Sequence, residues 1–202
     1  MNTFNLVYID DNIDNYLSSF LDNYQCQDKD NQIHYAEKPF DTGSDYESIL
    51  NDPKIRTANI IVIDDRLFED RTVEKGKFTG EEFKIVLKKY FPFIETVVIT
   101  QNQADEQVGT ISKYKPENLD QTPDEFYQEN LAEAIEEAIN SVMQYRRLNA
   151  KLHNNSNWEI VIQEKILNSI EGKGAFDELT KSDIDTIIDL FREMQGQFQD
   201  GN

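Results

Sequence analysis

Three short apolar runs, each ending at a polar or charged residue, constrain the fold of this chain more than any other feature. They cover Leu6–Ile9, Asn59–Ile63 and Thr96–Thr100. Each run is too short for a helix and rich in β-branched residues, which is typical of a buried strand. Two weaker runs, Ile33–Ala36 and Thr110–Tyr114, bring the number of predicted strands to five.

Helical patterns lie between the predicted strands. The clearest covers Gly80–Phe91, where an apolar stripe runs until Pro92 ends the helix. Gly109 supplies a turn before the last strand. Strands that alternate with helices form parallel sheets with helices on both faces. The sequence therefore predicts an α/β fold with a doubly wound, parallel five-stranded sheet.

A change in apolar spacing predicts a second, smaller region. The 202 residues suffice for one full domain and something smaller. After Glu125 the apolar residues follow steps of four and three, which is heptad spacing. We expect Leu131–Val142 to cover the sheet and Tyr145–Leu152 to extend beyond it, onto the last helices or another chain. The predicted division is a domain over 1–145 and a helical extension with a two-helix appendage over 146–202. The heptad residues are Leu131, Ile135, Ala138, Val142, Tyr145, Asn149 and Leu152.

The predicted appendage begins after a polar break at His153–Asn157. One helix is expected over Trp158–Ile170, and a last helix is expected after Ser182, ending near Gly196. Amphipathic helices of this length are marginal alone, so their apolar stripes need a partner surface. We expect a homodimer through the C-terminal helices, with Asn149 as a polar residue that sets the register.

Composition excludes several classes of function. The net charge of −19 repels nucleic acid and anionic membranes, and residues 150–202, with five Lys/Arg and ten Asp/Glu, are also acidic, which argues against DNA binding. The single cysteine excludes an intramolecular disulfide, and with two histidines the chain is poorly supplied for zinc. The sequence shows no secretory leader and no bilayer-spanning run, so a cytoplasmic protein is expected.

Polar side chains follow four of the predicted strands. In an open parallel sheet, ligands bind at the carboxyl ends of the strands, so these side chains are expected to share one pocket. Carboxylates that converge repel one another unless a cation lies among them, and oxygen ligands suit a hard ion such as Mg²⁺. A hydroxyl and an ammonium beside that ion would hold phosphoryl oxygens. The residues are Asp10 and Asp11, Asp64 and Asp65, Thr100, and Lys113.

The order of these motifs resembles a known family. The matching segments are VYIDDN, IIVIDDRL, TGEEFKIVLKKYFP, VVIT and GTISK. With them, residues 1–145 resemble the receiver domain of two-component response regulators, whose sheet is flavodoxin/CheY-like. The resemblance implies a phosphoacceptor that signals by protein contacts and is not a dedicated enzyme, apart from self-dephosphorylation. Its implied partners are a sensor histidine kinase or phosphotransfer protein and an output protein.

The resemblance also implies a role for each site residue. Asp64 is the implied phosphoacceptor, and attack of a carboxylate on phosphorus would give an acyl phosphate. Thr100 would bind the phosphoryl group, and Lys113 would neutralise its charge. Two alternatives stay open: Asp65 competes with Asp64, and Lys115 competes with Lys113. The implied Mg²⁺ ligands are Asp10, Asp11, Asp64 and the carbonyl of Arg66.

The chain departs from the receiver pattern in the region that normally transmits the signal. Between Thr100 and Lys113 there is room for little more than one helical turn, so the fourth helix is expected to be stunted or missing. Thr110 stands where receivers carry an aromatic residue, and Gln101 stands where they carry a small one. These departures favour, as the main alternative, a receiver-like scaffold or dimerisation module that is not phosphorylated.

A phosphohydrolase of the haloacid dehalogenase type is a further alternative. That family uses an aspartate after a parallel strand together with Mg²⁺, and it requires a second carboxylate two positions later. Arg66 follows Asp64 at that spacing, and Asn12 follows Asp10. The sequence therefore argues against this class.

Overall fold

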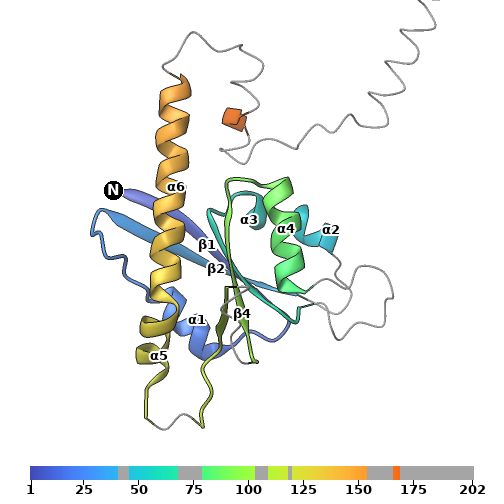
Figure 1. Cartoon of the computed structure of the whole chain (residues 1–202), viewed down its shortest axis with the longest axis vertical. Helices are drawn as coiled ribbons and strands as arrows, with labels where there is room; N and C mark the ends of the chain where they lie inside the picture. Colours follow the sequence, from blue (N-terminus) through green and yellow to red (C-terminus); the bar gives the residue numbers. More distant parts are fainter. Residues whose placement is uncertain (41–45, 68–78, 103–108, 118–119, 154–165, 169–202) are drawn as a thin grey trace, which may run out of the picture.

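The computed structural model describes residues 1–40, 46–67, 79–102, 109–117, 120–153 and 166–168. Five parallel strands form one sheet in the order β2-β1-β3-β4-β5 (Figure 1). This is the flavodoxin-like order, so the predicted α/β fold with a doubly wound parallel sheet is confirmed. The strands are β1 (Asn2–Asp10), β2 (Asn31–Pro39), β3 (Ile60–Asp64), β4 (Glu95–Thr100) and β5 (Thr110–Ser112).

Helices cover both faces of the sheet (Figure 1). One face carries α1 (Asn15–Asp22), α5 (Pro123–Asn130) and α6 (Ala132–His153). The opposite face carries α2 (Tyr46–Leu50), α3 (Pro53–Arg56) and α4 (Gly80–Tyr90). Among the described helices, none combines the length and the apolar character that a bilayer crossing requires.

Alternation along β1 divides its side chains between two apolar cores. Phe4, Leu6 and Tyr8 pack toward α1, α5 and α6, whereas Val7 and Ile9 pack toward α2, α3 and α4. Successive side chains of a strand point to opposite faces, so both sets are buried in a sheet that is covered on both sides. This burial explains why the central strands appear in the sequence as continuous apolar runs.

The long helix α6 stays in contact with the sheet beyond its midpoint. The Tyr145 hydroxyl donates a hydrogen bond to Glu95 at the start of β4. The Arg146 guanidinium donates to the Thr3 carbonyl at 2.7 Å and lies 4.5 Å from the centroid of the Phe4 ring. The helix therefore continues without a break across position 145, the predicted domain boundary, and the residues on both sides of this boundary contact the amino end of the sheet.

Several predicted elements lie outside the described residues. They include most of the connection between β4 and β5, where a stunted fourth helix is expected, and nearly all of the two-helix appendage. Of the appendage, residues 166–168 are described and helical. On α6, Leu152 is buried and Leu148 is 43% exposed. The expected homodimer through these helices stays a prediction.

Candidate functional site

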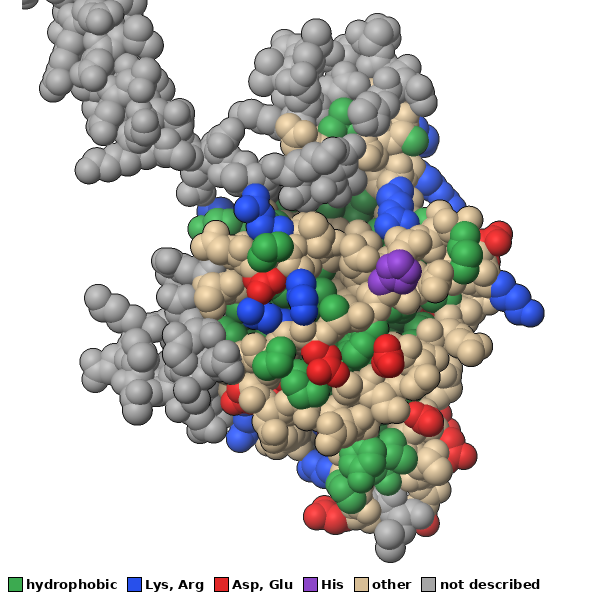
Figure 2. All heavy atoms as spheres, turned by 180° about the vertical axis from the view of Figure 1, so that it is seen from behind, with side chains coloured by type: hydrophobic (Ala, Val, Ile, Leu, Met, Phe, Trp, Pro, Cys, Tyr) green, Lys and Arg blue, Asp and Glu red, His purple; other side chains and the backbone are tan. Residues whose placement is uncertain are grey.

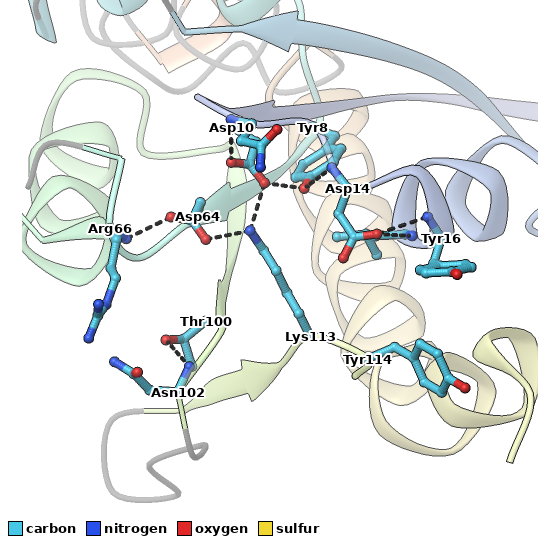
Figure 3. A network of polar contacts seen from close by, with 12 residues as sticks. Tyr8, Asp10, Asp14, Tyr16, Asp64, Arg66, Thr100, Asn102, Lys113 and Tyr114 are labelled. Atoms are coloured by element: carbon cyan, nitrogen blue, oxygen red, sulfur yellow. Dashed lines mark hydrogen bonds and ion pairs between the residues drawn. The ribbon is translucent and has the colours of Figure 1, made fainter. Parts of the chain in front are cut away.

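A buried ion-pair cluster lies at the carboxyl edge of the sheet, at the switch point between β1 and β3 (Figure 3). Asp10 ends β1 and Asp64 ends β3. The Nζ atom of Lys113 lies 2.7 Å from Asp10 Oδ2 and 2.7 Å from Asp64 Oδ1. The exposed fractions of Asp10, Asp64 and Lys113 are 1%, 4% and 4%. The strand ends thus bring together three of the charged residues that the sequence analysis selected.

Pairing between β4 and β5 decides which lysine enters the cluster. Thr100 lies opposite Ser112, and the Lys113 amide donates to the Thr100 carbonyl at 2.7 Å. Gly109 precedes β5 with a φ of 74°, a left-handed conformation that favours glycine. Lys113 therefore directs its side chain into the cluster, whereas Lys115 is exposed.

Asp10 is held by more donors than Lys113 alone. The Tyr8 hydroxyl donates to Asp10 Oδ2, and the Asn12 amide donates to Asp10 Oδ1 at 3.0 Å. Tyr8 is completely buried, and the Asp14 amide donates to its oxygen at 3.3 Å. The sequence pattern does not identify Tyr8 as a site residue, because a tyrosine in an apolar run is typical of a core residue. The spacing of two along a strand, which places Tyr8 and Asp10 on one face, is the signal that marks it.

Asp64 is held from two sides. Its Oδ2 atom accepts a hydrogen bond from the Arg66 amide at 2.8 Å, and its Oδ1 atom faces Lys113. Burial raises the pKa of Asp64, while the positive charge of Lys113 acts in the opposite direction. The ammonium therefore favours the ionised, nucleophilic form of a carboxyl group that burial would otherwise protonate.

Asp11 adds a third carboxylate to the cluster. Ligand oxygens of Asp10, Asp11 and Asp64 lie within 4.8 Å of one another. Asp11 itself is exposed, and its pKa is raised by partial desolvation and by the neighbouring Asp10 and Asp64. Three carboxylates beside one ammonium leave an excess of negative charge when all are ionised, so the cluster can hold a metal ion. Oxygen ligands alone suit a hard cation.

Thr100 and Asp65 lie at the same edge but take different positions. Thr100 is buried, and its Oγ1 atom accepts a hydrogen bond from the Asn102 amide at 3.2 Å. In the described part of the chain, the ion pairs of Lys113 involve Asp10 and Asp64 and not Asp65. Asp65 contributes its backbone instead, because its amide donates to the Ile99 carbonyl at 2.8 Å. Of the two adjacent aspartates, Asp64 therefore contributes its carboxylate to the cluster, and Asp65 contributes backbone hydrogen bonds.

Gly80 brings the start of α4 against the end of β3. Its amide donates to the Asp65 carbonyl at 2.7 Å. A Cβ atom at Gly80 would lie 2.7 Å from Asp65 Cα and 2.8 Å from the Asp64 carbonyl oxygen, which is too close for any side chain. A capping box between Thr79 and Glu82 fixes the first turn of the helix at this place. The glycine is therefore required by the backbone beside Asp64.

No protein-family model matches the chain, and no curated protein matches it either. The function must therefore be inferred from the fold and from the geometry of this cluster.

Proposed function

We propose that this protein is a phosphoacceptor of the response-regulator receiver type, in which Asp64 takes a phosphoryl group from a histidine kinase or phosphotransfer protein. The observation that carries the proposal is the buried Lys113 ammonium, 2.7 Å from both Asp10 and Asp64 at the switch point of the sheet. The resemblance of the strand-end motifs to receivers supports the same assignment. The output is contact with another protein and not DNA binding.

The proposed reaction is an in-line transfer to a carboxylate. An Asp64 carboxylate oxygen forms a bond to phosphorus, the bond between phosphorus and the donor nitrogen breaks, and the donor nitrogen keeps the electron pair and takes up a proton. The product is an acyl phosphate on Asp64. The reaction needs the ionised carboxylate, which the ammonium of Lys113 favours.

Two further side chains are assigned to the phosphoryl group. Lys113 would stabilise the negative charge on the phosphoryl oxygens as the transfer proceeds. The hydroxyl oxygen of Thr100 accepts from the Asn102 amide, which leaves its own proton free to donate to a phosphoryl oxygen. Both roles require that the two residues stay at the edge where the sheet now holds them.

The cation of the proposal is Mg²⁺. Asp10, Asp11 and Asp64 would hold it together with the carbonyl of Arg66, and it would supply neutralisation of charge at the phosphoryl group. The supporting observation is the mutual approach of the three carboxylates, whose charge Lys113 offsets only in part. Asp64 would then be both a ligand and the phosphoacceptor.

Intact mass measurement tests the assignment to Asp64. The purified full chain is treated with acetyl phosphate and Mg²⁺, and we expect a mass increase of one phosphoryl group that chelation of the metal abolishes. Asp64→Asn should prevent the increase, whereas the matched variant Asp65→Asn should leave it unchanged because that carboxylate lies outside the ion pairs. Uptake by Asp64→Asn at the wild-type level would refute the assignment.

A second candidate is a receiver-like scaffold that is not phosphorylated. It is favoured by the surroundings of Asp64, which is 4% exposed and has a donor facing each of its carboxylate oxygens. A phosphodonor would have to reach this buried carboxylate and displace a donor from it. This candidate predicts no adduct with any small phosphodonor. The mass experiment therefore separates the two proposals.

The proposal also includes a homodimer through the C-terminal helices. Leu148, 43% exposed on α6, is an apolar side chain that such a contact would cover. Sedimentation of the full chain against a truncation after His153 tests the dimer, because this truncation keeps the contacts of Tyr145 and Arg146 with the sheet. A full chain that is monomeric at tens of micromolar would refute the dimer, whereas a truncation that dimerises equally well would confine the contact to α6 and exclude the appendage from it.

A further inference from the structure

The second neighbour of Asp10 is a tyrosine that the proposed reaction does not use. Tyr8 is completely buried on the α1 side of the sheet, yet its hydroxyl reaches the Asp10 carboxylate (Figure 3). A buried hydroxyl needs a hydrogen-bond partner, and a phenylalanine would fill the same apolar space without that need. The hydroxyl must therefore be considered for its effect on Asp10.

The direction of the hydrogen bond is fixed by a second contact. The Asp14 amide donates to the Tyr8 oxygen at 3.3 Å, so the hydroxyl proton points elsewhere. Its acceptor is Asp10 Oδ2, because a carboxylate that faces the Lys113 ammonium is itself an acceptor. Tyr8 thus donates to Asp10, and the amide of Asp14, the N-cap residue of α1, holds it in that orientation.

This donation uses up the capacity of one carboxylate oxygen. A carboxylate oxygen accepts about two hydrogen bonds, and Asp10 Oδ2 already receives both the Tyr8 hydroxyl and the Lys113 ammonium. Asp10 Oδ1 receives the Asn12 amide and keeps the only remaining capacity of this carboxylate among the described contacts. A cation in the cluster therefore competes with donors at Asp10 more than at the exposed Asp11.

We propose that Tyr8 is a positioning residue that ties Asp10 to Lys113 and thereby weakens the binding of a divalent cation by the carboxylate cluster. The inference rests on the cation of the proposed function. The cation is then held mainly by Asp11 and Asp64, with Asp10 acting as the charge partner of Lys113. Removal of the hydroxyl leaves Lys113 as the one donor to Asp10 Oδ2 among the described contacts, so that oxygen regains the capacity to bind the cation, which tightens its binding.

The neighbouring strand offers a matched control. The Tyr35 hydroxyl donates to Glu37 at 3.1 Å, so it repeats the tyrosine and carboxylate pair at the same spacing along β2. Glu37 is not one of the three carboxylates that lie within 4.8 Å of one another. Tyr35→Phe therefore removes an equivalent hydrogen bond without touching the cluster.

The test is a titration of the full chain with Mn²⁺ alone, followed by electron paramagnetic resonance, with thermal melts in the absence of metal. We expect Tyr8→Phe to bind Mn²⁺ about tenfold more tightly than wild type, from the usual strength of a hydrogen bond to a charged group. Tyr35→Phe should bind Mn²⁺ as wild type does. A lower melting temperature is expected for both variants, so only the affinity separates positioning from a structural role.

Unchanged or weaker Mn²⁺ binding by Tyr8→Phe would overturn the inference, and so would a wild-type chain that binds no Mn²⁺. Wild-type binding that tightens in Tyr8→Phe supports the inference even if the chain takes up no phosphoryl group. In that case the proposed function fails and the role of Tyr8 stands, so the two failures are distinguishable.

Discussion

The two ends of the parallel sheet both carry a lysine paired with a carboxylate, but the pairs differ in burial. At the carboxyl end, the side chains of Lys113 and Asp10 are 4% and 1% exposed. At the amino end, Lys88 lies 3.0 Å from Glu95, and their side chains are 50% and 23% exposed. Water screens the second pair and is excluded from the first, so the same chemistry has different consequences at the two ends.

At the amino end of the sheet, side-chain contacts hold two helices against β4. Lys88 of α4 and Tyr145 of α6 meet at Glu95, where β4 begins. The carboxyl end instead gathers three carboxylates around one ammonium, an arrangement whose desolvation and repulsion cost stability. The buried end therefore carries a carboxylate cluster that could hold a metal ion, whereas the exposed end carries contacts that hold α4 and α6 against β4.

The largest expected effect comes from removing the buried ammonium. Lys113→Met leaves Asp10 and Asp64 buried without their common partner, and we expect a loss of about 3–5 kcal/mol in the free energy of unfolding. Lys88→Met should cost less than about 1 kcal/mol, because its partner is partly solvated. Urea denaturation of both variants measures the difference. Equal losses would erase the distinction between the two ends.

Gly80→Ala should have the next largest effect. The new methyl group would meet the backbone of Asp64 and Asp65 and force α4 away from β3. We expect a loss of about 1–3 kcal/mol in the free energy of unfolding, as for other overpacked positions. The control is Lys89→Ala, a substitution at an exposed residue of the same helix. A stable Gly80→Ala variant in thermal denaturation would show that the close contact is relieved cheaply.

Asp11→Ala should not lower the stability of the metal-free protein, although most substitutions do. Without metal, it removes one of the carboxylates that repel one another, so its melting temperature should equal or exceed that of wild type. Added Mg²⁺ should raise the melting temperature of wild type and not that of the variant, because a ligand stabilises only the state that binds it. A large loss of stability in the apo variant would mark Asp11 as a structural residue.

The smallest expected effect is on the dependence of stability on pH. Burial raises the pKa of Asp64, so the folded state takes up a proton before the unfolded state does. Its contribution to stability therefore increases as the pH falls through the raised folded-state pKa toward about 4, the ordinary pKa of the unfolded carboxyl group. Without metal, Asp64→Asn should make the free energy of unfolding less dependent on pH in the acid range. An unchanged dependence on pH would contradict the raised pKa of Asp64.

At the amino end of the sheet, the stability contributed by Lys88 should depend on pH in the alkaline range. The pKa of Lys88 is raised: desolvation lowers it, but the contacts with Glu95 and Tyr145 raise it by more. A raised lysine pKa gives stability that is present below the unfolded value and is lost as the pH rises through the folded one. Lys88→Met should therefore reduce the loss of stability above about pH 10, which denaturation curves recorded on both sides of that pH would measure.

The sequence predicts the sheet and the charged edge because both depend on local patterns. Apolar runs that end at Asp10 and Asp64 identify buried parallel strands, and parallel strands place their carboxyl ends at one edge. The first and last residues of the strands are harder to predict from the sequence. β1 begins at Asn2, before its apolar run, because each of its residues pairs with β2 from Asn31 onward. Backbone pairing of this kind does not depend on side-chain polarity.

Contacts between distant segments account for what the sequence did not reveal. The sequence favours Lys113 over Lys115 through the turn at Gly109, but the contacts of Lys113 with Asp10 and Asp64 depend on the register of β5 on β4. The heptad spacing did not reveal the interruption at Leu131, which caps α5 before α6 begins. Tyr8 shows the same limitation, since its role depends on its contacts with Asp10 and Asp14.

The most direct test of the central claim locates the phosphoryl group on the chain. After treatment with acetyl phosphate and Mg²⁺, borohydride reduces an acyl phosphate to the alcohol, and the modified aspartate is read as homoserine in the peptide that contains it. The account predicts homoserine at position 64, in a reaction that requires the metal. Homoserine at position 65, or no homoserine at all, would contradict the assignment of Asp64 as the phosphoacceptor.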